Sequence, residues 1–261
     1  SGGATTVNGT YAASTSTAKT GSGTATFTSS STVSGIGPAT FVVSGGTITF
    51  NSGELIAPTA LDLSGGTIDG TDTVTVSGAT TWTSGTMTGA GITNTSGGLT
   101  MSGTGFKDLT SRTLNLSPST IWSGTGAIRT GSAAVINNPG TWEAQNDVSI
   151  SNAFGGAAST INNTGTFRKT PGTGTTTISI IFNNNGVVDL QSGKLLLSGG
   201  GTGTGNFAGL AGTTLEFSAG TFAMNGTTAI TVPNVIFSGA TSTLATTTSM
   251  SVATAVFSGG A

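Results

Sequence analysis

One four-residue pattern returns at intervals of about 20 residues near the end of the chain, as LLLS at 195–198, LEFS at 215–218, VIFS at 235–238 and AVFS at 255–258. A fixed period of this length indicates a repeat protein whose units bury apolar side chains against their neighbours. The first and third residues of each pattern point the same way in a strand, because side chains alternate with period two. A second apolar column is expected at Leu190, Leu210, Ile230 and Met250. Each unit therefore sends at least three side chains inward.

The period extends to the rest of the chain. In the N-terminal half a Ser-Gly pair returns with the same step, at Ser44-Gly45, Ser64-Gly65 and Ser84-Gly85. In the middle, VINNPGTW (135–142), TINNTGTF (160–167) and IFNNNGVV (181–188) return in steps of 25 and 21, which indicates loop insertions around a fixed scaffold. We expect the asparagines at turns, with amides that can ladder between coils, although a ligand cage is conceivable.

These features predict an all-β fold, a parallel β-helix or β-solenoid with coils of about 20 residues and essentially no helix. About 12 or 13 coils at ~4.8 Å would give a rod roughly 60 Å long. The chain lacks the Leu-x-x-Leu-x-Leu pattern of leucine-rich repeats, and antiparallel sandwiches lack such a long register. Its 34% hydrophobic content argues against disorder. We expect residues 1–40 to form an irregular N-terminal coil or cap and residues 41–261 the repeat array, continuing in a parent protein.

The composition excludes several classes of function. Only 6% of residues are charged, the net charge is −2 and no basic stripe occurs, so nucleic acid is not expected as a partner. No apolar run is long enough for membrane insertion. The chain has no His and no Cys, which removes the usual catalytic triads and zinc sites. We therefore expect no enzyme, and we assign no catalytic residue, cofactor or metal site.

Three kinds of motif could nevertheless form a ligand or substrate site. Asp62, Asp69 and Asp72 could form a carboxylate or calcium site, but Asp beside Gly is typical of turns. The Gly-rich segment 198–205 lacks the Lys and helix of a phosphate loop. Thr-x-Thr elements could match an ice lattice, but they do not recur once per repeat unit; they begin at Thr24, Thr47, Thr73, Thr81 and Thr86.

One charged group is expected to line up across coils. Aligning Gly140, Gly165 and Gly186 places three charges, those of Glu143, Arg168 and Asp189, in one column. Their apolar neighbours Trp142, Phe167 and Val188 also align, so the charges should face outward. Arg168 would then be shared by both carboxylates. We interpret the trio as a ladder that fixes coil register, with an active site as the alternative.

Three segments carry a resemblance: TVSGATTWTSGTMTGAG (75–91), the run 161–201 and TTLEFSAGT (213–221). They resemble the β-strand repeat regions of very large secreted bacterial surface proteins, similar in style to filamentous-haemagglutinin and autotransporter passenger stalks. The resemblance implies an extracellular, cell-surface location and a structural or adhesive role as a stalk, matrix or filament component.

The expected partners are neighbouring repeats or further copies end to end, since uncapped strands can template pairing, and surface glycans are a further candidate. The alternative functions are an ice- or carbohydrate-binding β-solenoid and a polysaccharide-degrading enzyme.

Overall fold

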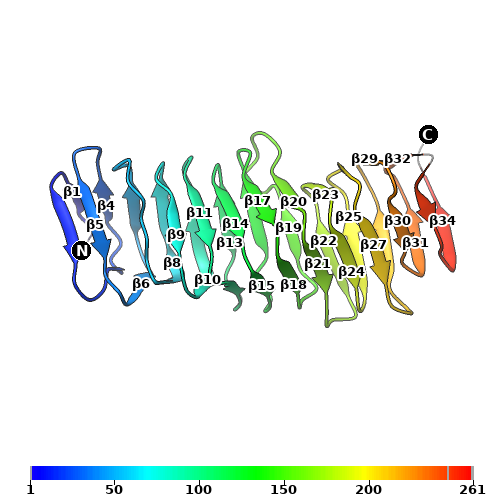
Figure 1. Cartoon of the computed structure of the whole chain (residues 1–261), viewed down its shortest axis with the longest axis horizontal. Coiled ribbons are helices and arrows are strands. Elements are labelled where there is room, and N and C mark those ends of the chain that lie inside the picture. Colours follow the sequence, from blue (N-terminus) through cyan, green and yellow to red (C-terminus); the bar gives the residue numbers. More distant parts are fainter. Residues whose placement is uncertain (1, 246, 260–261) are drawn as a thin grey trace.

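The computed structural model describes residues 2–245 and 247–259, which form an elongated rod of stacked coils with the two chain ends at opposite ends (Figure 1). The rod has about 12 coils of about 21 residues each, and these residues contain no helix. The predicted parallel β-solenoid is confirmed. Residue 1 and residues 260–261, which end the two ranges predicted from the sequence, lie outside the described residues.

Each coil contributes to parallel ladders of strands, which we name ladders I, II and III. Strands of ladder I pair from one end of the rod to the other. They are β1 (Ala4–Val7), β4 (Thr24–Phe27), β7 (Thr47–Phe50), the second parts of β8 (Ala60–Gly70) and β10 (Thr80–Met87), β13 (Lys107–Thr110), β16 (Ile128–Gly131), β19 (Ser149–Ser151), β22 (Thr175–Ile178), β25 (Lys194–Leu197), β28 (Thr214–Phe217), β31 (Asn234–Phe237) and β34 (Thr254–Phe257).

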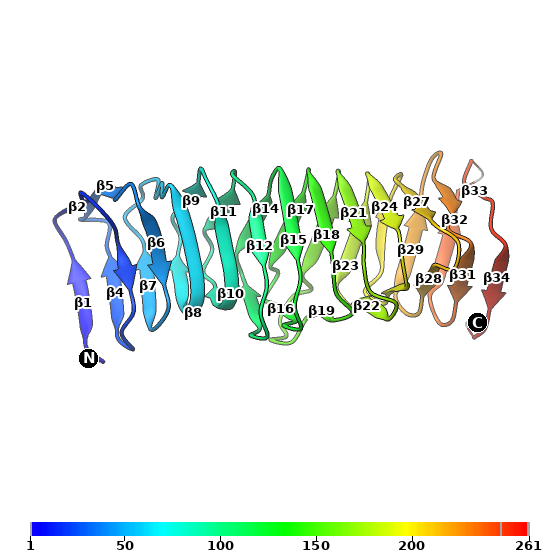
Figure 2. The same ribbon diagram turned by 90° about the horizontal axis from the view of Figure 1, so that it is seen from below.

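Ladder II runs beside it, and several of its strands lie side by side along the rod in Figure 2. Its strands are β3 (Ala18–Lys19), β6 (Thr40–Val43), the first parts of β8 and β10, β12 (Leu99–Met101), β15 (Ser119–Trp122), β18 (Thr141–Ala144), β21 (Thr166–Lys169), β24 (Val187–Leu190), β27 (Asn206–Gly209), β30 (Ala229–Thr231) and β33 (Ser249–Met250).

Ladder III completes the coil and is interrupted twice. Its strands are β2 (Thr10–Ala13), β5 (Thr32–Ile36), β9 (Val74–Val76), β11 (Ile92–Thr95), β14 (Thr113–Leu116), β17 (Val135–Asn138), β20 (Thr160–Asn163), β23 (Ile181–Asn184), β26 (Gly201–Gly203), β29 (Thr221–Met224) and β32 (Thr241–Leu244).

The core is built of stacked columns, as the repeat pattern predicts. Leu195, Leu215 and Val235 are register partners and fully buried. In the neighbouring column the rings of Phe217 and Phe237 stack with centroids 5.3 Å apart. Each buried side chain of this size contributes about 1.5–3 kcal/mol of transfer free energy, so stacking supplies the burial that one coil cannot.

Leu210 is an exception to the predicted columns. Leu190 pairs with Gly209, and Phe207 pairs with Ile230, so Leu210 lies beyond the end of β27 and is 53% exposed. Register partners here follow in steps of 19 (Val188 to Phe207) and 23 (Phe207 to Ile230). The predicted column was therefore wrong for Leu210, and Ile230 shares its column with Val188 and Phe207 and not with Leu190. A short coil precedes a long one, and the average step hides the difference.

The N-terminal segment takes part in the same ladders. Strands β1 to β4 each pair in parallel with a strand of the next coil, and β5 is the partner of β2. Tyr11 packs edge-on against Phe27 at a centroid distance of 5.1 Å, and Phe27 stacks on Phe50 at the same distance. The aromatic core therefore reaches into residues 4–36.

The first interruption of ladder III follows β5. Here the chain contributes only one bridge, from Ile56 to Val74. The carboxylate of Glu54 accepts a hydrogen bond from the backbone N–H of Val33 at 2.9 Å. The Glu54 carboxylate takes the place of the carbonyl that a neighbouring strand would supply, so the backbone N–H of Val33 stays hydrogen-bonded.

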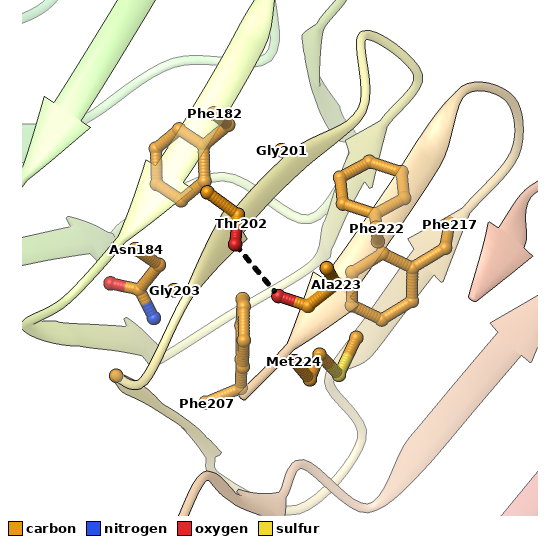
Figure 3. Close-up of a pocket in the computed structure, with 11 residues that line it drawn as sticks. Phe182, Asn184, Gly201, Thr202, Gly203, Phe207, Phe217, Phe222, Ala223 and Met224 are labelled. Atoms are coloured by element: carbon orange, nitrogen blue, oxygen red, sulfur yellow. Dashed lines mark hydrogen bonds between the residues drawn. The ribbon is translucent and has the colours of Figure 1, made fainter. Parts of the chain in front are cut away.

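The second interruption separates β23 from β26, where the backbones approach unusually closely. A Cβ on Gly203 would lie 1.7 Å from the carbonyl oxygen of Asn184, so only glycine fits. The irregularity leaves a cavity of about 10 Å³ among aromatic and Met side chains, drawn in Figure 3. It is lined by Phe182, Phe207, Phe217, Phe222 and Met224, among others. This volume admits about one water molecule, so the cavity is a packing defect and not a ligand site.

Buried side-chain N–H groups donate hydrogen bonds to backbone carbonyls at the corners between ladders II and I. Nε1 of Trp82 donates to the carbonyl of Gly85 at 3.2 Å, and Nε1 of Trp122 donates to that of Gly126 at 3.3 Å. Trp82, Trp122 and Lys169 occupy one column of ladder II. These side chains supply hydrogen bonds that the turn carbonyls would otherwise lose on burial.

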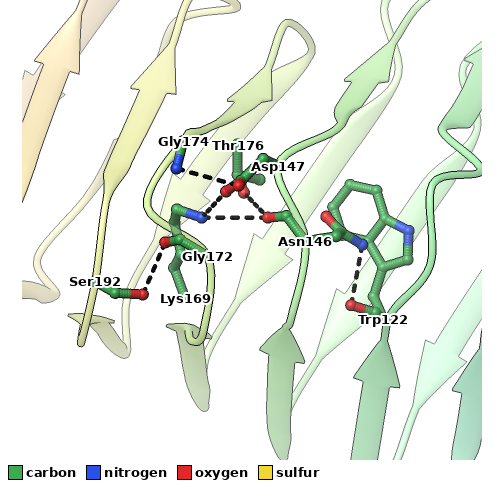
Figure 4. Close-up of polar contacts among 8 residues, drawn as sticks. All are labelled: Trp122, Asn146, Asp147, Lys169, Gly172, Gly174, Thr176 and Ser192. Atoms are coloured by element: carbon green, nitrogen blue, oxygen red, sulfur yellow. Dashed lines mark hydrogen bonds and ion pairs between the residues drawn. The ribbon is translucent and has the colours of Figure 1, made fainter.

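Lysines have the same role in other coils. The fully buried ammonium of Lys107 donates to the carbonyls of Ser102 and Gly105, and burial lowers the pKa of Lys107. Lys169, also fully buried, contacts the carbonyl of Asn146 at 3.2 Å and the carboxylate of Asp147 at 2.6 Å (Figure 4). The ammonium groups therefore stabilise the interior corners of the rod.

Candidate functional site

The charged trio lies where the sequence places it. Glu143 pairs in register with Arg168, and Arg168 with Asp189, so the predicted alignment is confirmed. Trp142 and Phe167 are fully buried on the other side of the strands, which places the charges outside. Nε of Arg168 donates to Asp189 at 2.9 Å, whereas Glu143 makes no ion pair within the described residues. Arg168 is therefore not shared, and its exposed pair is worth at most about 1 kcal/mol.

The three aspartates of the segment 62–72 do not come together. Asp62 lies on the outer face of ladder II and Asp69 on that of ladder I. Asp72 is buried at the next corner, where it accepts hydrogen bonds from the N–H and hydroxyl of Ser52 and the N–H of Gly53. Across residues 2–245 and 247–259, no three His, Cys, Asp or Glu side chains lie close enough to share a metal ion. The turn interpretation fits Asp72, but Asp62 and Asp69 lie within strand β8.

Arg112 is a buried cation that the sequence analysis did not single out. Its guanidinium donates to the carbonyls of Gly70, Asp72, Thr88 and Ile92, at 2.9 to 3.2 Å, and to the Thr93 hydroxyl. Burial lowers the pKa of Arg112 to about 10, although Asp69 and Asp72 oppose the shift. Since all these donors bond the chain itself, the group ties neighbouring coils together.

The repeated asparagine pairs lie in strands and form two amide ladders, so the prediction of turns was wrong for them and that of laddering amides is confirmed, whereas Asn185 follows strand β23 at a bend. In the outer ladder each asparagine donates its side-chain N–H to a side-chain oxygen of the previous coil, at 2.7 to 3.0 Å. The donors are Asn94, Asn115, Asn137, Asn162 and Asn183. On the inside, Asn138 donates to Asn163, and Asn163 to Asn184, in the opposite direction. The amides bond one another, so we find no ligand cage here.

The Thr-x-Thr elements are more regular in space than in sequence. The elements beginning at Thr24, Thr47 and Thr86 all lie on ladder I, and Thr67 fills the coil between the last two. Thr24, Thr47, Thr67 and Thr86 are thus successive register partners. Unequal loops hid this recurrence. The companion column is interrupted, because Asp69 follows Thr49.

The sequence analysis also missed an exposed cluster on ladder I, which we call the aromatic patch: Phe106, Arg129 and Phe154. The Arg129 guanidinium lies 4.0 Å from the ring centroid of Phe106 and 5.1 Å from that of Phe154. Asp108, its register partner, holds it by two hydrogen bonds of 2.7 and 2.6 Å, which raise the pKa of Arg129. The long step at Asn137 was the available signal, because its extra loop carries Phe154.

Two grooves open on the surface of the described residues, besides a smaller one of about 220 Å³ beside Thr80 and Leu99. One, of about 410 Å³, follows the first interruption of ladder III and is lined by Gly53, Glu54, Leu55 and residues 71–73. The other, of about 330 Å³, lies at the C-terminal end of the rod beside Phe237, Leu244 and Phe257. Neither gathers a set of groups for acid–base or nucleophilic chemistry.

Comparison with known proteins found no matching family model, no similar curated protein and no similar solved structure. Among the described residues, no helix has the length and apolarity needed to cross a membrane. The surface and the ends of the rod are therefore the features that bear on function.

Proposed function

We propose that this protein is a structural and adhesive module of an extracellular bacterial surface protein, serving as part of a stalk, matrix or filament, and that it is not an enzyme. The observation that carries the proposal is the unbroken parallel stacking of coils along ladder I, which makes a rod with a long lateral surface. Its hydroxyl- and amide-rich outer faces suit multivalent weak contacts. The bacterial, cell-surface origin rests on the sequence resemblance.

Pairing of the end strands with a further coil, in a neighbouring repeat or in another copy of the rod, is part of this proposal. Within the described residues, β1 and β34 are each paired on one side only, and the inward-facing Phe257 of the last coil is 71% exposed. Its ring stacks on Phe237 at 5.1 Å, so the exposed face of Phe257 presents the next position of an aromatic column. Unpaired parallel strands with apolar ends favour pairing with a further coil.

Sedimentation velocity over a range of concentrations tests the association. We expect the wild-type rod to lengthen by whole rods, and Phe257→Lys to abolish the lengthening because it places a charge in the interface. Leu210→Lys is the control, because it alters an exposed apolar side chain on the side of the rod. A wild-type protein that stays monomeric, or a Phe257→Lys variant that associates equally well, contradicts end-to-end assembly.

Adhesion and location have separate tests. Beads coated with the purified rod should adhere to cells or extracellular matrix more than beads coated with a protein of equal charge. Antibodies against the rod should label intact cells of the organism that encodes it. The surface role would be refuted if rod-coated beads adhered no better than the control beads and the antibodies labelled cells only after lysis.

A second candidate function is ice binding, favoured by the column of four successive threonines on ladder I, which runs from Thr24 to Thr86. Hydroxyl and methyl groups at a regular spacing of ~4.8 Å offer a repeating template for ordered water. Thermal hysteresis in the wild-type protein that is lost in Thr47→Lys/Thr67→Lys would support this function, and the absence of hysteresis would exclude it.

A further inference from the structure

The aromatic patch has the features of a prepared surface. Phe106 and Phe154 are 50% and 47% exposed, whereas most of the 12 phenylalanines are buried, and the one other exposed in the described residues, Phe257, lies at the end of the rod. Paired apolar rings on the side of a rod cost solvation free energy, so such patches commonly mark interaction sites. Shielding of the Arg129–Asp108 pair does not account for the exposed ring faces, because the Arg129 side chain remains 32% exposed beside them.

The loop that carries Phe154 is bonded to the rod and does not hang free. The N–H of Phe154 donates to the carbonyl of Thr130 at 3.0 Å, and the N–H of Ser132 donates to the carbonyl of Gly155 at 2.8 Å. A Cβ on Gly131 would lie 2.6 Å from the Cβ of Phe154, so a glycine is required beneath the loop. The chain therefore fixes Phe154 over ladder I.

Backbone strain is concentrated at the same place. The non-glycine residues with positive φ in the described chain are Ser111, Ser132 and Ala133, with φ of 58°, 52° and 59°. Ser111 donates its N–H to the carbonyl of Gly131, directly below the loop. Left-handed backbone at non-glycine residues is unfavourable and clusters at functional sites. The three strained residues support the loop insertion and its aromatic ring.

The polar groups between the rings are only partly used. Nε and Nη2 of Arg129 donate to Asp108, but Nη1 has no acceptor within residues 2–245 and 247–259. Each Asp108 oxygen retains capacity to accept a second hydrogen bond. A free donor and a carboxylate acceptor therefore belong to one ion pair, whose guanidinium lies against both rings. The register neighbours Thr86 and Ser151 supply hydroxyls on either side.

We propose that the aromatic patch is a glycan-binding site, which takes a neutral sugar ring of a surface polysaccharide. This inference rests on the proposed adhesive function and names its ligand. The C–H face of a pyranose packs on a phenyl ring, while one sugar hydroxyl accepts a hydrogen bond from Nη1 of Arg129 and another donates to the carboxylate of Asp108. Asp108 neutralises the guanidinium and repels a carboxylate, which favours a neutral sugar over an acidic one. Two rings are also small beside the ~800 Å² that each partner buries in a stable protein interface.

Affinity electrophoresis through gels containing a panel of neutral and acidic polysaccharides tests the site. We expect at least one neutral polysaccharide to retard the wild-type protein, and Phe106→Ala/Phe154→Ala to weaken its affinity at least about tenfold. Arg129→Lys should weaken it as well, because lysine keeps the charge but loses the planar fork. The control is Leu55→Ala/Leu210→Ala, which removes two equally exposed apolar side chains elsewhere. Circular dichroism verifies that every variant keeps its β fold.

The outcomes separate the site from the proposed function. If beads adhere and glycans bind, but the Phe106→Ala/Phe154→Ala variant binds them as tightly as the wild type, the patch is not the site and the adhesive function stands. If the protein binds acidic polysaccharides alone, the ligand is a carboxylate and the proposal of a neutral sugar is overturned. If it binds no polysaccharide but the double variant loses bead adhesion to a protein surface, the ligand is a protein and the glycan proposal is overturned. If the beads do not adhere at all, the adhesive function itself fails.

Discussion

Replacing one asparagine of the inner amide ladder should destabilise the rod far more than its size suggests. Asn163 is fully buried; its Nδ2 donates to Oδ1 of Asn184 at 2.8 Å and to the carbonyl of Val187 at 3.2 Å, and its Oδ1 accepts from Asn138 at 2.7 Å. Asn163→Leu removes all three bonds and keeps the branched shape of the side chain, with a larger volume. The carboxamide oxygen of Asn184 is then buried without a donor.

The magnitude follows from two opposing terms. An orphaned buried acceptor costs about 1–3 kcal/mol, and each other lost bond about 1 kcal/mol. Burial of the leucine side chain returns about 1–2 kcal/mol. We expect the free energy of unfolding to fall by about 2–3 kcal/mol. Asn162→Leu, in the half-exposed outer ladder, should cost less than about 1 kcal/mol, because its former partners can bond water instead.

Urea unfolding followed by tryptophan fluorescence measures both variants, since all three tryptophans are buried in the rod. The triple variant Asn138→Leu/Asn163→Leu/Asn184→Leu extends the test. It leaves no orphaned amide, so its cost should be well below three times that of Asn163→Leu. Equal costs for Asn163→Leu and Asn162→Leu, or a strictly additive triple variant, would refute the reasoning.

Three further predictions concern charge and backbone. Burial lowers the pKa of Lys107 below 10.5, so the folded state binds this proton less tightly than the unfolded chain. The free energy of unfolding should therefore rise as the pH increases from the lowered pKa toward 10.5. Urea midpoints measured across that range should show this rise in the wild type and lose it in Lys107→Met. Burial alone would raise the pKa of Glu216, but hydrogen bonds, led by that from Lys194, outweigh burial and lower this pKa below 4.5. The free energy of unfolding should therefore fall as the pH drops below 4.5. In the same assay Glu216→Gln should remove that loss. A Cβ on Gly165 would lie 2.0 Å from the carbonyl oxygen of Gly140, so Gly165→Ala should lower the thermal unfolding temperature, at a cost of about 1–3 kcal/mol; an unchanged temperature would contradict this close approach.

The sequence predicts the fold well where coil lengths are equal. Along ladder I, from Leu195 to Phe257, register partners follow in constant steps of 20, so the apolar columns can be read directly and are found in register. Where loops vary, as at Leu210 and in the threonine column, a fixed period misplaces residues or hides their alignment. Hydrogen bonding between coils, and not the local turn propensity of asparagine, decides that the Asn pairs lie in strands.

The surface was harder to predict than the core. Alternation placed Glu143, Arg168 and Asp189 on one outer face, but only side-chain geometry shows that Arg168 contacts Asp189 and not Glu143. Phe106 and Phe154 are far apart in the sequence, and a non-repeating loop brings them to the same guanidinium. No periodic pattern encodes that contact.

The Arg112 guanidinium has a mechanical consequence. A rod pulled from its ends should unravel one coil at a time, and a coil of about 21 residues releases ~70 Å of extended chain. Arg112, however, is bonded to backbone at Gly70 and Asp72 and also at Thr88 and Ile92. Coils clamped by one side chain cannot yield independently. A force–extension trace should therefore show regular steps broken by one longer, stronger event, and Arg112→Met should divide that event into ordinary steps.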